Sequence, residues 1–191
     1  MRLLAILFLS ITASCVFAQA NFYHQLADSA LTLTQQRVQY DPAYFSINYP
    51  NGDVPADKGV CTDVVIRAYR KLGIDLQKEV HEDMLANFSE YPNHWGLTRT
   101  DRNIDHRRVP NLMVFFTSHG MVKQITSAAS DYKPGDIVCW QLPRGMTHIG
   151  IVSHKTVGNT PMIIHNIGAG QVVENILFDY PIIGHYRYTK Q

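Results

Sequence analysis

The chain has 191 residues, of which 46% are hydrophobic and 17% charged, with 17 Lys and Arg against 16 Asp and Glu. This composition suits one folded domain with a substantial core, and it excludes a disordered chain, a collagen, a coiled coil and a multi-pass membrane protein. Because charge is balanced and no basic block occurs, nucleic acid is not an expected partner.

The first twenty residues have the layout of a secretory signal peptide. A positive charge near the start precedes a short apolar run, residues 3–9, and then a series of small residues. The apolar run is too short to span a bilayer. We therefore expect residues 1–20 to be removed and residues 21–191 to form a single catalytic domain, periplasmic or secreted, with no integral membrane segment after signal removal. Cleavage before Cys15, which would give a lipoprotein, is the alternative.

Apolar residues at helical spacing predict three helices in the first half of this domain. They cover residues 22–38, 61–72 and 76–88. Residues 40–59 are rich in turn-forming residues, and we expect a loop there.

From about residue 132 the pattern changes to short strands separated by Gly, Pro and Asn. The predicted strands are residues 137–140, 147–154, 162–167, 171–178 and 182–188. Their order predicts an antiparallel meander. Helices followed by strands indicate an α+β fold, with N-terminal helices packed on a C-terminal antiparallel sheet.

Cys61 falls in the first turn of the second predicted helix. The helix N-terminus and a neighbouring imidazolium would both lower the pKa of its thiol, which favours a nucleophilic role. Backbone N–H groups at the same helix start could stabilise an oxyanion. Because exported proteins form disulfides, a bond between Cys61 and Cys139 is the alternative.

His148 and His165 are the candidate partners of this thiol. If residues 155–160 form a loop between two paired strands, His165 lies opposite Gly150 and on the same face as His148. His148 would then act as the base and His165 would orient it, as in cysteine hydrolases. Two satisfied sheet histidines or a zinc site are alternatives, but no zinc-binding motif occurs, so we expect no metal and no cofactor.

Residues 99–108 hold four arginines and two aspartates. A guanidinium can grip a substrate carboxylate with two parallel hydrogen bonds, so Arg107 and Arg108 are candidate substrate-binding residues. A solvated, internally paired loop is the alternative. Asp63, in the first turn of the same helix as Cys61, is a third candidate, although it could instead favour the helix dipole or pair with one of these arginines.

Several segments resemble, in the same order, the NlpC/P60 cysteine peptidases, which are papain-like bacterial enzymes that cut peptidoglycan stem peptides or other amides. The segments are residues 59–65, 134–138, 148–152 and 162–166. The chain also resembles the DUF1287 branch of that superfamily, in residues 49–57, 61–70 and 103–112. The resemblance covers about residues 40–188.

The resemblance implies that Cys61 is the nucleophile, His148 the base and His165 the third polar residue, with Tyr49 near the active site. The residues that flank the cysteine differ from the Asp before it and the Ser-Gly after it in the better-known cell-wall peptidases, which leaves the substrate open. We expect hydrolysis of an amide bond, most simply in peptidoglycan stem peptides. A non-catalytic cell-wall binding module and an acyltransferase that uses the same cysteine are the alternatives.

Overall fold

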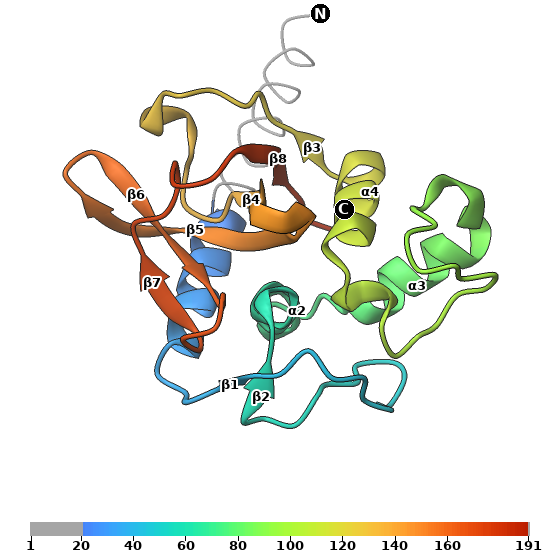
Figure 1. Ribbon diagram of the computed structural model, residues 1–191. Helices are drawn as coiled ribbons and strands as arrows, with labels where there is room; N and C mark the ends of the chain where they lie inside the picture. The colour runs from blue at the N-terminus through green and yellow to red at the C-terminus, as the bar shows by residue number, and fades with distance from the viewer. Residues whose placement is uncertain (1–20, 191) are drawn as a thin grey trace, which may run out of the picture.

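The structure is a computed structural model that describes residues 21–190 (Figure 1). The predicted signal peptide and its cleavage sites lie outside these residues. An antiparallel six-stranded sheet carries helices on one face, so the predicted α+β class is confirmed. No helix within the described part of the chain is both long and apolar enough to cross a membrane.

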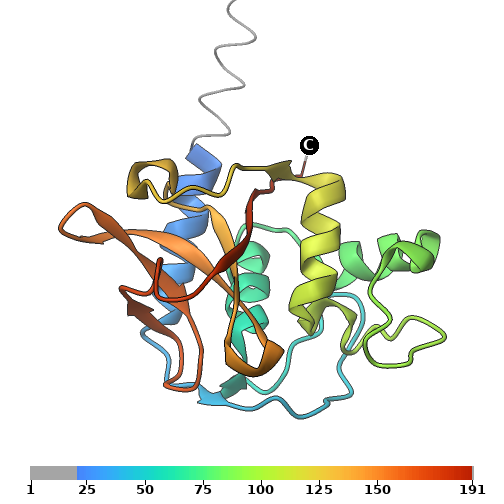
Figure 2. The same cartoon turned by 45° about the horizontal axis from the view of Figure 1, so that its top comes forward.

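Four helical segments of more than one turn lie within the described residues. A first one covers residues 21–33, and the others are α2 (Cys61–Lys71), α3 (Leu76–Ala86) and α4 (Val109–His119). Figures 1 and 2 show residues 21–33, α2 and α4 beside the sheet, with α3 on the far side of α4. The first helix ends five residues before the predicted boundary, and α4 was not predicted. Short 3-10 turns occur at Phe88–Glu90, Asp105–Arg107, Ala129–Asp131 and Pro143–Gly145.

The main sheet has the strand order β3-β8-β4-β5-β6-β7. Its strands are β3 (Met121–Val122), β4 (Ile137–Gln141), β5 (Thr147–Val157), β6 (Thr160–His165), β7 (Val172–Glu174) and β8 (Ile182–Arg187). A separate parallel pair, β1 (Gln39–Tyr40) and β2 (Lys58–Gly59), lies in the predicted loop.

The meander prediction holds from β4 to β7 and is wrong for β8, which returns to pair with β4. The connection between β7 and β8 crosses the face of the sheet that the helices leave open. There Leu177 packs in a small apolar cluster with Trp140, whose Nε1 donates a hydrogen bond of 3.0 Å to the Leu177 carbonyl. Burial of this cluster favours the crossing over a continued meander.

The β5–β6 hairpin decides where the two histidines lie. Ile151 pairs with Ile164 and Val152 with Ile163, and this is the register that was predicted. The predicted loop over residues 155–160 is wrong, because both strands continue outward to the pair Val157 and Thr160. An irregularity between Val152 and Thr156 shifts the outer pairs by two residues, so the longer hairpin leaves the inner register intact.

The core between helices and sheet surrounds α2. Nine consecutive residues, from Cys61 to Tyr69, are buried, because one side of α2 faces the sheet and the other is covered by loops. Val64, Val65 and Ala68 of α2 belong to the same apolar cluster as Ile149 of β5 and Ile164 of β6. This packing brings the N-terminus of α2 to the strands that carry His148 and His165.

Candidate active site

The start of α2 is held by a buried ion pair. Val60 is the N-cap, and its backbone N–H donates to Oδ2 of Asp63 at 2.7 Å. Arg107 donates to both carboxylate oxygens of Asp63, through Nε and Nη2, each at 3.0 Å. Its remaining donors reach the backbone carbonyls of Ala43 and Asp41. Asp63 and Arg107 therefore anchor the helix turn that begins with Cys61.

This arrangement favours a structural role for Asp63 and Arg107, although Arg107 also lines the cleft at Cys61, so substrate binding by these two residues stays a prediction. Both side chains are almost fully buried, and the Arg107 guanidinium is engaged by Asp63 and by backbone carbonyls. A substrate carboxylate would have to displace Asp63 to take the same geometry. The structure contains the alternative ion pair, between Asp63 and Arg107.

The thiol of Cys61 lies against β5. The backbone N–H groups of Ile149, Thr62 and Cys61 itself act on its sulfur and lower its pKa. Burial nevertheless raises the pKa of the Cys61 thiol to about 12, with a smaller contribution in the same direction from Asp63. The expected low pKa is therefore wrong for the substrate-free structure, because loss of water outweighs the helix N-terminus. The thiol of Cys61 is therefore neutral at pH 7.

His148 and His165 are in direct contact. Nε2 of His148 lies 2.9 Å from Nδ1 of His165, and the rings meet edge to face. Burial, and next the charge of His165, lower the pKa of His148 to about 3, so its ring is neutral at pH 7. A neutral imidazole can accept a proton, so His148 is a candidate general base.

Gly150 makes room for this contact. A Cβ added at Gly150 would lie 2.6 Å from Cγ2 of Ile163, 3.0 Å from the Ile164 carbonyl oxygen and 3.2 Å from Cβ of His165. Only a residue without a side chain allows β6 to approach β5 this closely.

Glu174, which the sequence analysis missed, extends the chain of contacts. Its Oε2 lies 3.0 Å from Nε2 of His165. β7 pairs with β6, which brings the carboxylate to the ring. Burial lowers the pKa of His165, and the Glu174 charge opposes that effect. The only hint in the sequence was a lone acidic residue in a predicted strand adjacent to the one that carries His165.

The two contacts are compatible with one set of tautomers. Nε2 of His165 lies 3.0 Å from the Glu174 carboxylate without hydrogen-bond geometry. Because a carboxylate only accepts hydrogen bonds, a proton on Nε2 is the tautomer that suits this distance. Nδ1 of His165 then accepts from Nε2–H of His148. The unprotonated nitrogen of His148 is therefore Nδ1, and this atom is the candidate base for the thiol of Cys61.

A cleft of about 210 Å³ opens above the thiol. Its walls include Tyr40, Trp95, Arg108 and Thr147. Tyr49, expected near the active site, lies elsewhere, with its hydroxyl 3.5 Å from Glu82 of α3. Of the predicted binding residues, the structure thus brings Arg107 and Arg108 to the cleft and leaves Tyr49 outside it. Tyr40 and Trp95 were missed because loops far apart in sequence place them there.

Cys61 and Cys139 are both free and buried, so the alternative of a disulfide between them is not the state of this structure. Within residues 21–190, no group of three or more His, Cys, Asp or Glu side chains is arranged to hold a metal ion.

Comparison with known proteins gives a family and a fold. The family model DUF1287, a domain of unknown function, matches residues 27–188. The uncharacterised protein YijF of Escherichia coli K12 is 50% identical over 180 residues, which are 94% of this chain and 88% of that protein.

Solved structures are similar at low sequence identity. An N-acetylmuramoyl-L-alanine amidase from Bacteroides uniformis has a TM-score of 0.51 at 12% identity, over 88% of this chain and 99% of that chain. NlpC1 from Trichomonas vaginalis has a TM-score of 0.47 at 18% identity, over 88% of this chain, which spans 45% of the length of that protein. The fold is thus similar to that of the Bacteroides uniformis amidase, and the chain belongs to the DUF1287 family.

Proposed function

We propose that this protein is an exported cysteine hydrolase that cleaves an amide bond in peptidoglycan stem peptides. The observation that carries the proposal is the series of contacts from His148 through His165 to Glu174. The two histidines lie on β5 and β6, the strands against which α2 packs with the free thiol of Cys61 at its N-terminus. The fold shared with an N-acetylmuramoyl-L-alanine amidase supports an amide substrate of the cell wall. Export rests on the features of residues 1–20.

The proposed reaction begins with both partners neutral. As Sγ of Cys61 attacks the carbonyl carbon, its proton passes to Nδ1 of His148. The backbone N–H groups at the start of α2 stabilise the oxyanion. The imidazolium then returns the proton to the leaving amine, which departs and leaves a thioester. Water, deprotonated by His148, hydrolyses the thioester and regenerates the thiol.

Two groups keep His148 ready for both proton transfers. His165 holds its ring through the 2.9 Å contact and accepts the hydrogen bond that leaves Nδ1 unprotonated. When His148 becomes positively charged, the Glu174 carboxylate stabilises that charge through His165. No metal or cofactor takes part in this scheme.

The test is mass spectrometry of purified peptidoglycan after incubation with the protein, its Cys61→Ala variant and a Cys139→Ala control. We expect new fragments from the wild type and from Cys139→Ala, and none from Cys61→Ala. The fragment masses identify the bond. If Cys61→Ala releases the same fragments, the proposal is wrong. If no protein releases fragments but all three sediment with peptidoglycan, the protein is a binding module instead.

A further inference from the structure

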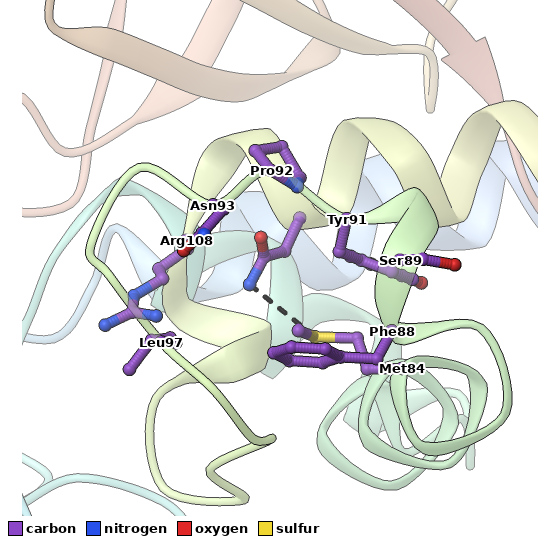
Figure 3. Close-up of a pocket in the computed structure, with 9 residues that line it drawn as sticks. Met84, Phe88, Ser89, Tyr91, Pro92, Asn93, Leu97 and Arg108 are labelled. Atoms are coloured by element: carbon purple, nitrogen blue, oxygen red, sulfur yellow. Dashed lines mark hydrogen bonds between the residues drawn. The ribbon is translucent and has the colours of Figure 1, made fainter.

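A second cavity lies next to the cleft at Cys61 and shares Arg108 with it. It measures about 220 Å³. A cavity of roughly 150 Å³ is enough for a benzene ring, so this one can admit an amino-acid residue. Figure 3 shows Arg108 and Leu97 on one side of it, with Met84 and Phe88 opposite. Tyr91 and Pro92 complete a largely apolar wall.

Two polar atoms at this cavity lack a partner. Asn111 is 1% exposed and lines the cavity, and its Oδ1 makes no hydrogen bond within the described chain. Its Nδ2 donates to the Asp105 carbonyl at 3.0 Å and contacts Sδ of Met84, which fixes the orientation of the amide. Nη1 of Arg108 is likewise buried without an acceptor. Because buried polar groups in folded proteins are nearly always paired, this cavity offers one unmet acceptor and one unmet donor.

Arg108 differs in this respect from its neighbour Arg107. Among residues 21–190, no carboxylate lies within 4.0 Å of the Arg108 side chain, and that side chain makes no hydrogen bond, whereas Arg107 is fully occupied by Asp63 and backbone. The guanidinium carbon of Arg108 stacks over the Trp95 ring, 4.1 Å from its centre. The positive charge of Arg108 is therefore held where the cavity meets the cleft at Cys61, and it is available to bind an anion.

The spacing of Arg108 and Asn111 defines what fits. Arg108 is the N-cap of α4, and Asn111 follows three residues later, so the two side chains are neighbours at the helix start. The N-terminus of a helix also favours negative charge. A ligand that binds Arg108 through a carboxylate still finds an unpaired acceptor, Oδ1 of Asn111, in the same cavity for one of its hydrogen-bond donors.

We propose that this cavity is a substrate subsite for an amino-acid residue that carries a free α-carboxylate and its adjacent amide N–H. The carboxylate binds Arg108, the N–H donates to Oδ1 of Asn111, and the apolar part of the residue packs on Met84 and Phe88. The proposal rests on the proposed function, because the subsite adjoins the cleft at Cys61. In a stem peptide, two residues have this chemistry: the C-terminal residue and a glutamate linked through its γ-carboxyl.

Three peptides distinguish these sources. The first is the stem tetrapeptide L-alanyl-γ-D-glutamyl-L-lysyl-D-alanine, the second is its C-terminal carboxamide, and the third has the glutamate α-carboxylate converted to a carboxamide. Isothermal titration calorimetry measures their affinity for the full protein with Cys61→Ala, which binds without cleavage. We expect one of the two carboxamides to bind about ten- to a hundredfold more weakly than the acid, since a hydrogen-bonded charge is lost.

Arg108→Met in the Cys61→Ala protein is expected to abolish that difference in affinity, because it weakens the binding of the acid tetrapeptide and not that of the carboxamide. The Arg108 side chain makes no hydrogen bond in the described fold, so this variant is expected to fold normally, and a thermal melt checks this. Arg99→Met is the matched control, since Arg99 is exposed and lines a different hollow. It is expected to keep the preference of the Cys61→Ala protein.

Equal affinity for all three peptides, no binding, or a preference that survives Arg108→Met would overturn the subsite. Cleavage of the same peptides by the wild type is measured separately. If the Arg108-dependent preference is found without cleavage, the proposed hydrolysis fails and the carboxylate subsite stands.

Discussion

Oε2 of Glu174 lies 3.0 Å from Nε2 of His165, although the glutamate side chain is 42% exposed and the histidine is buried. The pair links a partly exposed carboxylate to the buried histidines, because His165 in turn contacts His148. Burial alone lowers the pKa of His165, and the carboxylate raises it. We therefore expect Glu174 to act as a positioning residue that favours the proton on Nε2 of His165.

Glu174→Gln is expected to lower kcat/KM by roughly tenfold. This is less than the roughly 10⁴-fold loss seen when the carboxylate of a catalytic triad is replaced, because Glu174 acts through a second imidazole and water can reach it. Nitrogen NMR of the ring tautomers should show a changed protonation pattern at His165 and His148. Asp179→Asn, at an exposed carboxylate, is the control. Unchanged tautomers and unchanged kcat/KM in Glu174→Gln would remove Glu174 from the mechanism.

The Asp63–Arg107 pair is expected to contribute stability rather than affinity for substrate. Removing one partner of a buried ion pair leaves the other charge unpaired and costs about 3–5 kcal/mol. We therefore expect Arg107→Met to lower the free energy of unfolding by about that amount, measured by urea denaturation. Arg102→Met, at an exposed arginine of the same segment, should change it little. A large rise in KM without loss of stability in Arg107→Met would restore the substrate-binding role.

Gly150→Ala tests the close approach of β5 and β6. The new Cβ would lie 2.6 Å from Cγ2 of Ile163, so β6 has to move and His165 moves with it. We expect a loss of about 1–3 kcal/mol in stability and a fall in kcat/KM measured where the variant is fully folded. Gly158→Ala, in the open hairpin turn, is the control for stability, because it strains a residue with a φ of 58° far from the thiol. Full activity in folded Gly150→Ala would mean that the histidine contact tolerates displacement.

The parts of the fold that the sequence predicted correctly are those governed by local pattern. Apolar spacing and the N-terminal position of Cys61 predicted α2, and period-two alternation predicted that His148 and His165 share a face of the sheet. The free space at Gly150 follows from the same alternation. In each case the residues involved are near neighbours along a helix or across one hairpin.

The missed features depend on contacts between distant segments. Glu174 reaches His165 only because β7 pairs with β6, and Tyr40 reaches the cleft only through the small β1–β2 pair. The choice of Arg107 rather than Arg108 as the partner of Asp63 depends on which side chain points inward from a 3-10 turn. The crossing of β8 depends on burial of Leu177 over the sheet. Pattern within one segment carries no information about such partners.

Two buried histidines are expected to make the fold sensitive to acid. Burial, and next the charge of Arg107, lower the pKa of His106 to about 3, and burial lowers that of His148 to a similar value. In the unfolded chain a histidine has its usual pKa of about 6.5. Between pH 6.5 and 3 the unfolded chain therefore binds protons that the folded chain does not, and stability falls as pH falls.

The expected loss from pH 7 to pH 5 is about 2 kcal/mol for each of these histidines, since each pH unit below 6.5 is worth about 1.4 kcal/mol. Urea denaturation at pH 7, 6 and 5 measures it. His106 is the residue to replace, because it lies outside the catalytic group and its Nδ1 has no hydrogen-bond partner in the described chain. His106→Gln removes one group that binds a proton only in the unfolded chain. The slope of the unfolding free energy against pH should therefore fall by about 1.4 kcal/mol per pH unit below pH 6.5, whatever the stability of the variant at pH 7. An unchanged slope would show that His106 becomes protonated in the folded protein, which its buried position between α3 and α4 argues against.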